Sequence, residues 1–243
     1  MRGTKTWRTA GIFTVCLAMA CAGQARAQSV QPMRFDLKPS GPEAQTTLKV
    51  ENNRTHPITI ELAAETITLD EQGREVLQPA DDFLIFPPQA IIAPGVTQSV
   101  RVRYIGAPDI ERSNSYRVMV RQIPVDLSGE QRSGVALAFN FATLAAVVPV
   151  GAKPDLTVSP LAPEDGQRVS TTIENSGRAY ARVLAYDWAL RDGASERIVS
   201  PDDLTRMITG VSGLIPPGAT RRFTIVLPEG FDPRSTTLSL SPK

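Results

Sequence analysis

The side chains that most often catalyse reactions or bind metal ions are scarce in this sequence of 243 residues. It has one histidine, His56, in the turn-like stretch NNRTHPIT, and two cysteines, Cys16 and Cys21, near the N-terminus. A zinc site or a nucleophile–histidine pair needs several such side chains together. A single histidine in an exposed turn is typical of an ordinary surface residue.

Acidic pairs at Asp81–Asp82 and Asp202–Asp203 are the other candidates for acid–base chemistry. Pairs of this kind in polar loops are usually solvated or cap helices. The glycine-rich patterns that bind phosphate groups or dinucleotides do not occur in the sequence. The sequence therefore predicts a binding protein rather than an enzyme, with no metal ion and no cofactor.

The first 27 residues have the pattern of a secretory signal peptide. Basic residues in MRGTKTWR precede the apolar stretch TAGIFTVCLAMACAG, which is short for a membrane span, and Ala25–Ala27 form an A-x-A cleavage signature. The mature chain would then begin at Gln28. Cys21 resembles a lipoprotein cleavage site, but Ala18 stands where a branched apolar residue is usual, so we favour cleavage after Ala27.

Removal of residues 1–27 would leave an exported protein without cysteine, and hence without disulfides. The segment contains four of the 26 basic residues and no acidic one, which leaves 22 basic against 25 acidic residues, a net charge of about −3. A net negative charge argues against a nucleic-acid-binding protein. No later stretch of the sequence is long and apolar enough for a membrane span.

Two parts of the sequence repeat with one shared offset. VENNRTHPITIEL and IENSGRAYARVLA place Glu51 and Glu174 123 residues apart. IAPGVTQSVRV and IPPGATRRFTI have the same offset, which also relates Gly95 to Gly218. One offset at two separated places indicates two related units, each with a strand, a Pro-Gly turn and a further strand.

Short alternating segments bounded by Gly, Pro, Asn and Asp make up most of the mature sequence, and helical periodicity is almost absent. This pattern predicts an all-β fold of two antiparallel sandwiches. Breaks at Pro149, Gly151 and Pro154 divide the chain into domains at 28–150 and 151–243. The strands expected in the first domain lie near 30–38, 46–52, 57–69, 83–93, 98–104, 115–123 and 135–149.

The last of these strands, in GVALAFNFATLAAVVPV (134–150), is uncharged and has no full counterpart in the shorter second unit. Its bulky side chains alternate, which places four of them on one side of an extended chain: Val135, Leu137, Phe139 and Phe141. Spacing alone favours packing in the strand's own core, because any sandwich strand alternates in this way. The other interpretation is that this hairpin carries the function.

Four segments together form a pattern that is found in a known family: TLKVENN (47–53), FPPQAIIAPGVTQSVRVRY (86–104), YRVMVRQIPV (116–125) and GVALAFNF (134–141). They resemble the PapD-like periplasmic chaperones of chaperone–usher pilus assembly, and QPADDFLIFPP is closest to the archaic or alternative branch of that family. The resemblance implies two immunoglobulin-like sandwiches in a boomerang arrangement. It also implies that the last strand of the first sandwich is lent to a pilin subunit that lacks its own final strand. The residues that would fill the subunit's groove are Val135, Leu137, Phe139 and Phe141.

The same resemblance implies a basic anchor for the C-terminal carboxylate of the subunit, but the sequence departs from the family here. Typical members have an arginine on the first strand and a lysine on the last one, where this chain has Asp36 and Leu144. Arg34 lies on the same side of the first strand as Asp36 and is the best substitute. Arg117, on the neighbouring strand, is the second candidate, although either side chain could be an ordinary surface arginine.

The sequence therefore predicts a periplasmic chaperone that binds pilus subunits and an outer-membrane usher, without enzymatic activity, cofactor, nucleic acid or membrane span. The alternative is a structural or adhesive tandem-sandwich protein of the cell envelope, anchored through a lipid on Cys21. The family has a tight turn at Phe86–Pro87, and aromatic–proline bonds are cis more often than most bonds to proline, so we also expect this peptide bond to be cis.

Overall fold

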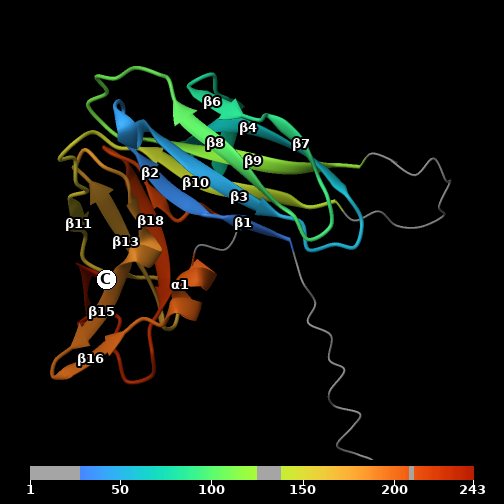
Figure 1. The fold of residues 1–243 in the computed structure, drawn as a ribbon. Coiled ribbons are helices and arrows are strands. Elements are labelled where there is room, and N and C mark those ends of the chain that lie inside the picture. The colour runs from blue at the N-terminus through green and yellow to red at the C-terminus, as the bar shows by residue number, and fades with distance from the viewer. Residues whose placement is uncertain (1–27, 125–137, 208–210) are drawn as a thin grey trace, which may run out of the picture.

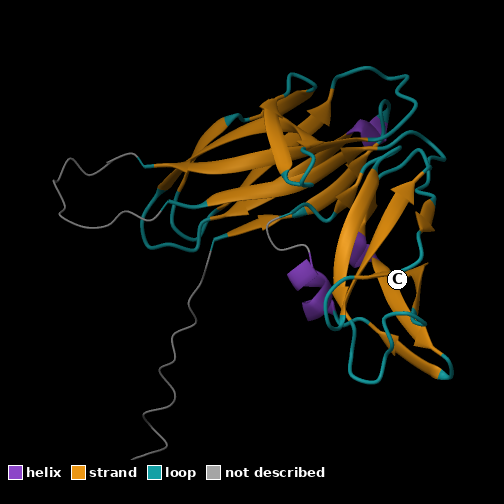
Figure 2. Ribbon diagram, turned by 180° about the vertical axis from the view of Figure 1, so that it is seen from behind, coloured by secondary structure: helices purple, strands orange, loops and turns teal. Residues whose placement is uncertain are grey.

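A computed structural model describes residues 28–124, 138–207 and 211–243. Over these residues the protein is almost entirely β and consists of two sandwiches that meet at an angle (Figures 1 and 2). The predicted fold class, two immunoglobulin-like sandwiches, is confirmed. The predicted signal peptide, 1–27, lies outside the described residues.

The N-terminal sandwich packs a sheet of order β1-β3-β8-β6 on a sheet of order β2-β10-β9-β4-β5, with β7 also paired to β4. Neighbouring strands are antiparallel except β2 and β10, which are parallel. A short 3-10 turn, η1 (Pro42–Ala44), precedes β3. The strands are β1 (Ser29–Gln31), β2 (Arg34–Leu37), β3 (Gln45–Glu51), β4 (Ile58–Leu69), β5 (Glu75–Pro79), β6 (Phe83–Phe86), β7 (Gln89–Ile92), β8 (Thr97–Tyr104), β9 (Asn114–Ile123) and β10 (Asn140–Val147).

Alternation of side chains along each strand builds the core of this sandwich. In β8, for example, Val100, Val102 and Tyr104 are buried, while the residues between them are exposed. The same period in the other strands brings branched apolar side chains from both sheets into one cluster. The outward-facing residues of each strand are therefore free to form surfaces for partners.

Two strands expected from the sequence are each divided by a proline. The expected strand 30–38 becomes β1 and β2 on either side of Pro32, and 83–93 becomes β6 and β7 on either side of Pro87. In both cases the two halves belong to different sheets. Proline has no N–H to continue a ladder, so the chain changes sheets there. The peptide bond Phe86–Pro87 is cis, as predicted.

The C-terminal sandwich is smaller and is built from three short sheets. In its core, the ring of Trp188 meets the ring of Phe223 edge to face, with centroids 5.6 Å apart. Its elements are β11 (Leu156–Val158), β12 (Ala162–Pro163), β13 (Arg168–Asn175), β14 (Ala181–Arg182), η2 (Val183–Ala185), β15 (Tyr186–Asp192), β16 (Ser195–Ile198), α1 (Pro201–Met207), β17 (Leu214–Ile215), β18 (Thr220–Val226) and β19 (Thr237–Pro242). No helix in the described ranges is long and apolar enough to cross a membrane.

The repeat seen in the sequence is also present in the strand pairing. In the N-terminal sandwich, Leu48 of β3 pairs with Val100 of β8. In the C-terminal sandwich, Thr171 of β13 pairs with Phe223 of β18, and both residues lie 123 positions later. The two sandwiches therefore share the register of their central strand pair.

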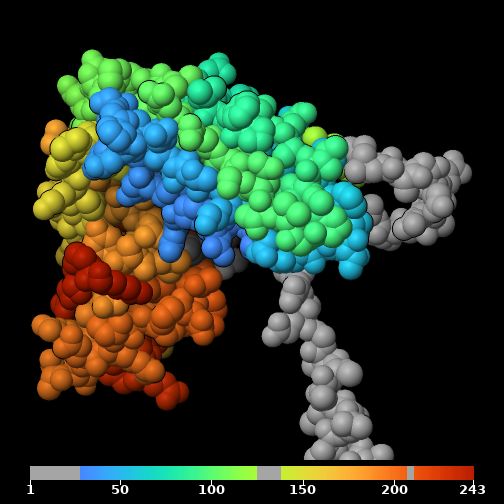
Figure 3. All heavy atoms as spheres, viewed as in Figure 1, coloured from blue at the N-terminus to red at the C-terminus, as the bar shows by residue number. Residues whose placement is uncertain are grey.

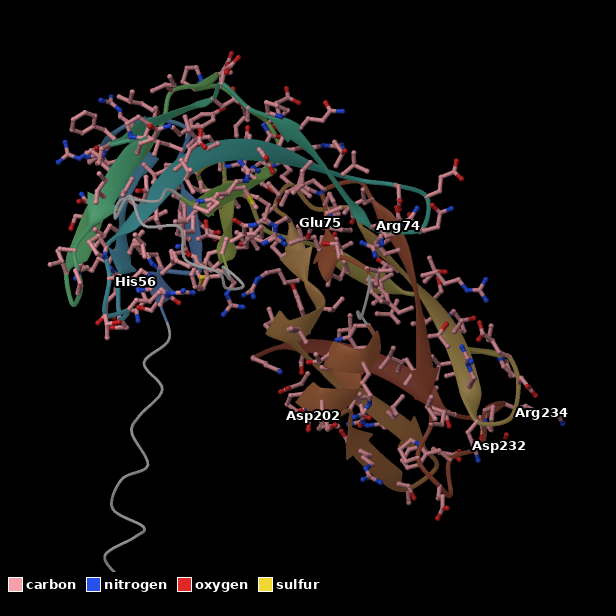
Figure 4. All side chains as sticks on the ribbon, turned by 90° about the vertical axis from the view of Figure 1, so that its right-hand side faces the viewer. His56, Arg74, Glu75, Asp202, Asp232 and Arg234 are labelled. Atoms are coloured by element: carbon pink, nitrogen blue, oxygen red, sulfur yellow. The ribbon has the colours of Figure 1, made fainter. Side chains whose placement is uncertain are left out.

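A buried asparagine makes equivalent hydrogen bonds in each sandwich, at the corner where the chain turns after β3 or β13. The Asn52 side-chain amide donates hydrogen bonds to the carbonyl oxygens of His56 (3.0 Å) and Ile92 (2.8 Å). Asn175 donates at 2.8 and 2.9 Å to the carbonyl oxygens of the residues 123 positions later, Ala179 and Ile215. The side chain of His56 is exposed in its turn, far from the second sandwich (Figure 4).

The two sandwiches touch along one side of the molecule (Figure 3). Ala146 and Val148 at the end of β10 pack against Ala179 of the second sandwich. Next to this small apolar contact, the Ser113 hydroxyl accepts a hydrogen bond of 2.7 Å from the Tyr180 N–H. An apolar contact and a hydrogen bond therefore both hold the two sandwiches together at the junction.

Candidate functional site

A cleft of about 370 Å³ lies at this junction, between the outward face of the sheet that contains β10 and the second sandwich. Its walls are partly apolar, with Leu144 from one sandwich and Leu184 and Leu214 from the other. The charged side chains that line it are Arg34, Arg117 and Glu75 of the N-terminal sandwich and Arg182 of the C-terminal one.

Strand alternation places the charged residues of β9 on this outward face. Val118 and Val120 point into the core, so Arg117 and Arg121 point away from it. The parallel pairing of β2 with β10 sets Arg34 beside Leu144, which itself pairs with Arg117. Both predicted anchor arginines therefore line one cleft.

Arg117 is held by a carboxylate. Its Nε and Nη2 donate to the two oxygens of Glu75 at 2.9 and 2.7 Å, a bidentate pair. The Ser212 hydroxyl, from the second sandwich, donates to the same carboxylate at 2.7 Å. Burial raises the pKa of Glu75, but the hydrogen bonds from Arg117 and Ser212 outweigh it and hold that pKa below its usual value. Glu75 therefore stays ionised and neutralises Arg117.

The other arginines on this side of the molecule are in different situations. Arg121, next on the same face of β9 but outside the cleft lining, is paired with Glu65. Arg34 is exposed and makes no ion pair with any residue in the described part of the chain. Arg182 is half-buried and approaches the phenol of Tyr180 without a carboxylate partner among the described ion pairs. Arg34 and Arg182 are thus the cations of the cleft best able to accept an anion.

Asp36, which occupies the family's usual arginine position, has a role at the junction instead. Its carboxylate accepts a hydrogen bond of 2.7 Å from the hydroxyl of Tyr180 in the second sandwich. Burial, together with this bond to an ionised carboxylate, raises the pKa of the Tyr180 hydroxyl. A negatively charged carboxylate repels another anion, so this position is unsuited to anchoring the carboxylate of a subunit.

Two of the four predicted donor residues, Phe139 and Phe141, lie at the start of β10 or directly before it. Phe139 and Phe141 are half-buried, pack against the edge of the core cluster and have ring centroids 5.1 Å apart. β2 pairs with β10 only over Leu144–Val147, so in the described residues the preceding part of β10 has a partner only on the β9 side. Val135 and Leu137, the other two predicted donor residues, lie outside the described residues.

Arg182 and Glu75 are the charged residues of the cleft that the sequence analysis missed. Arg182 lies inside the repeated segment IENSGRAYARVLA. Glu75 follows the tight turn of the β4–β5 hairpin, and the sequence has no alternating pattern that predicts this hairpin. Neither residue has neighbours in the sequence that would mark it as part of a site. Only the packing of one sandwich against the other makes them neighbours.

The fold and the cleft define a tandem immunoglobulin-like binding protein, and the comparisons with known proteins identify its kind. Residues 29–147 match the family "Pili and flagellar-assembly chaperone, PapD N-terminal domain". The match covers the N-terminal sandwich from β1 to β10. Through its N-terminal sandwich, the chain belongs to this family of PapD-like pilus-assembly chaperones. No protein of curated function matches the sequence significantly.

Solved structures with the same fold share little sequence with this chain. A chain of the CsuC–CsuE chaperone–tip adhesion subunit pre-assembly complex from Acinetobacter baumannii is 15% identical, with a TM-score of 0.58 over 89% of this chain and 97% of that one. A chain from the Salmonella enterica SafA pilin–SafB chaperone complex is 18% identical, with a TM-score of 0.54 over 84% and 86% of the two chains. At such identities, the likeness shows a common fold.

Proposed function

We propose that this protein is a periplasmic chaperone that holds pilus subunits by donor-strand complementation and passes them to an outer-membrane usher. The observation that carries the proposal is the edge of β10 ahead of Leu144, which no strand of the described ranges covers and which lies beside two half-buried phenylalanines. The family supports a role in pilus assembly. The SafA–SafB and CsuC–CsuE complexes, in which related chaperones hold a pilin or a tip subunit, support the choice of partner.

The chemistry of the edge fits a protein strand as its ligand. An unpaired strand edge offers main-chain N–H and C=O groups to any extended segment laid beside it. Phe139 and Phe141 offer apolar surface next to that edge, and complete burial of a phenylalanine is worth about 1.5–3 kcal/mol. Val135 and Leu137 would extend the same row into the subunit by their spacing.

We propose that the C-terminal carboxylate of the subunit binds in the cleft. Arg34 stands where β2 stops covering β10, so a segment paired with the uncovered edge would end beside it. Arg182 faces the same space from the second sandwich. Arg117 contributes less than the sequence suggested, because Glu75 already occupies its paired donors. A chain-terminal carboxylate between apolar walls matches this set of side chains.

The usher would need a different surface, and the outward face of β6 and β8 offers one. Leu84 and Phe86 are 54% and 70% exposed, and Arg101 pairs with Phe86 across the two strands. A shallow depression of about 760 Å³ runs over these side chains. It lies on the sheet opposite to the one that contains β10, so an usher could bind here while a subunit is held.

Co-expression with a secreted pilus subunit tests the proposal. We expect the mature chain to co-purify with the subunit as a soluble one-to-one complex. Phe139→Glu should abolish the complex, because a charge would be buried without a partner, while the urea midpoint of the free protein changes little. Leu84→Glu, an exposed apolar residue on the other sheet, is the matched control and should leave capture intact. A large fall of the midpoint in Phe139→Glu would show that Phe139 serves only the chaperone's own core.

A further inference from the structure

Arg221, in β18, is an arginine inside the protein, with 8% of its surface exposed. Its Nη1 donates to the carbonyl oxygen of Leu214 at 2.7 Å, and its Nη2 to those of Ser212 at 3.1 Å and Gly73 at 3.4 Å. The guanidinium also lies over the ring of Phe223, 5.5 Å from its centre. All three acceptors are main-chain carbonyl oxygens. Burial of a cation without a carboxylate is costly, so this arrangement requires an explanation.

The repeat shows that the strand register shared by the two sandwiches does not by itself require this arginine. The residue 123 positions earlier is Gln98 of β8, which is only partly buried and donates to the neighbouring Ser99 carbonyl. The two positions share the same strand register. The environment of Arg221 therefore differs from that of Gln98 in something other than the strand register. The difference is that Arg221 lies at the junction between the two sandwiches.

The three carbonyl groups come from both sandwiches. Ser212 and Leu214 belong to the segment that leads into β17, while Gly73 is in the turn between β4 and β5. The same turn receives a main-chain hydrogen bond of 2.8 Å from the Ser212 N–H. Figure 4 shows the next residues of this hairpin, Arg74 and Glu75, beside the second sandwich. Arg221 thus joins two segments that meet beside the cleft, since Glu75 of one and Ser212 of the other both line it.

Gly73 fits this contact in two ways. Its φ of 78° lies in the left-handed region, which glycine adopts without strain. A side-chain carbon at this position would overlap the Arg221 guanidinium. The close approach of the turn to Arg221 thus depends on a residue without a side chain.

We propose that Arg221 is a positioning residue for the subunit-binding cleft. By holding the β4–β5 turn against the Ser212–Leu214 segment, it sets how far Arg34 of one sandwich stands from Arg182 of the other. The importance of that spacing rests on the function proposed above. The guanidinium suits this task because it remains charged at all physiological pH values and offers several donors in a fixed plane.

The test measures the arrangement of the sandwiches and the binding of subunit separately. Residues 28–243 contain no cysteine, so spin labels can be attached through Gln45→Cys and Ser195→Cys, which are exposed strand positions in the two sandwiches. The variants are Arg221→Met, Arg221→Lys and, as matched control, Arg222→Met. Arg222 is the exposed neighbour, and its partners Glu164 and Ser170 lie within its own sandwich.

We expect one narrow distance distribution in the unsubstituted protein and in Arg222→Met, a broad one in Arg221→Met, and partial narrowing in Arg221→Lys. If about a tenth of the broadened population keeps the competent cleft, subunit affinity falls about tenfold in Arg221→Met. Urea midpoints establish that each variant is folded. Gly73→Ala should broaden the distribution as well. Gly193→Ala, also at positive φ but with open space around it, should not.

An unchanged distribution in both Arg221→Met and Gly73→Ala would overturn the proposal. So would a broadened distribution with unchanged subunit affinity, because the spacing would then not matter to the cleft. If the unsubstituted protein binds no subunit at all, the proposed function fails, and the distance distributions still decide whether Arg221 sets the spacing.

Discussion

In the N-terminal sandwich, β9 pairs with β4 on one side and with β10 on the other. The corresponding strand of the C-terminal sandwich, β19, pairs with β15, and among the described residues no strand takes the place of β10. There β11 lies close to β19 instead. Within the described residues, one sandwich thus has a strand that the other lacks. The second half of this strand, with Ala145 and Val147, is part of the core, whereas the part ahead of Leu144 has an edge that no described strand covers.

A second difference lies at the opposite edge of each sandwich. In the N-terminal one, β8 pairs with β6, which exposes Leu84 and Phe86 to solvent. In the C-terminal one, α1 packs near the equivalent strand β18 and buries Leu204 in the core. At this edge the N-terminal sandwich exposes Leu84 and Phe86, while the C-terminal one buries Leu204 and exposes Val226 at the end of β18. The donor edge and the usher surface that we propose thus both lie on the N-terminal sandwich.

The largest effect we expect tests what the two sandwiches share. Asn52→Ala and Asn175→Ala each remove a buried amide that satisfies two main-chain carbonyl groups. With unsatisfied groups costing about 1–3 kcal/mol each, we expect a loss of roughly 3–5 kcal/mol in either variant. Trp188 is the only tryptophan after residue 27, so its fluorescence reports the C-terminal sandwich alone.

In urea titrations, Asn175→Ala should therefore shift the fluorescence transition. Asn52→Ala should shift the circular dichroism transition and leave much of the fluorescence change in place. Asn140→Ala, at an exposed strand position, serves as the control. Losses that differ by several kcal/mol between the two variants would contradict the equivalence of the two corners.

A smaller effect concerns the junction between the sandwiches. The pKa of Glu75 is lower in the folded protein than its ordinary value of 4.5. Its contribution to stability is therefore complete above pH 4.5 and is lost as the pH falls through the lower, folded value. We expect Glu75→Gln to cost about 1–2 kcal/mol at pH 7, because charged hydrogen bonds to Arg117 and Ser212 are weakened.

The measurement is the urea midpoint of both proteins from pH 7 to pH 3. The difference between them should shrink towards the acid end, since the wild-type carboxyl becomes neutral there as well. A difference that is constant with pH would mean that ionised Glu75 does not stabilise the junction.

Periodicity and the repeat were sufficient to predict the fold, because they report which side of each strand is buried. The alternation that includes Phe139 and Phe141 showed only that these side chains share one side of a strand. That the strand is lent to a subunit followed from the resemblance to the chaperone family. The β4–β5 hairpin was missed because β5 is exposed at nearly every position and so lacks a period. The division of strands at Pro32 and Pro87 was missed because a proline marks an interruption without showing that the chain changes sheets.

The composition of the cleft could not be read from the sequence for a different reason. Arg117 and Arg34 were placed on one sheet by strand alternation, which is a local property. Whether Glu75 or Arg182 reaches the same space depends on the angle at which two separately folded sandwiches meet. That angle depends on contacts between residues more than a hundred positions apart, such as Ser212 with Glu75.

The smallest effect we expect comes from copying Arg221 into the other sandwich. Gln98→Arg places an arginine at the equivalent position of β8, where no second sandwich provides carbonyl groups. The longer side chain can extend to solvent from this partly exposed position, so the free energy of unfolding should change by less than about 1 kcal/mol. Arg221→Gln, the reverse exchange, removes the bonds to Leu214, Ser212 and Gly73 and should lower the urea midpoint clearly more. Equal changes in the urea midpoint for the two exchanges would mean that the contacts of Arg221 with Leu214, Ser212 and Gly73 do not stabilise the protein. Unequal effects would locate the need for an arginine in the meeting of the two sandwiches, since the strand register around the two positions is the same.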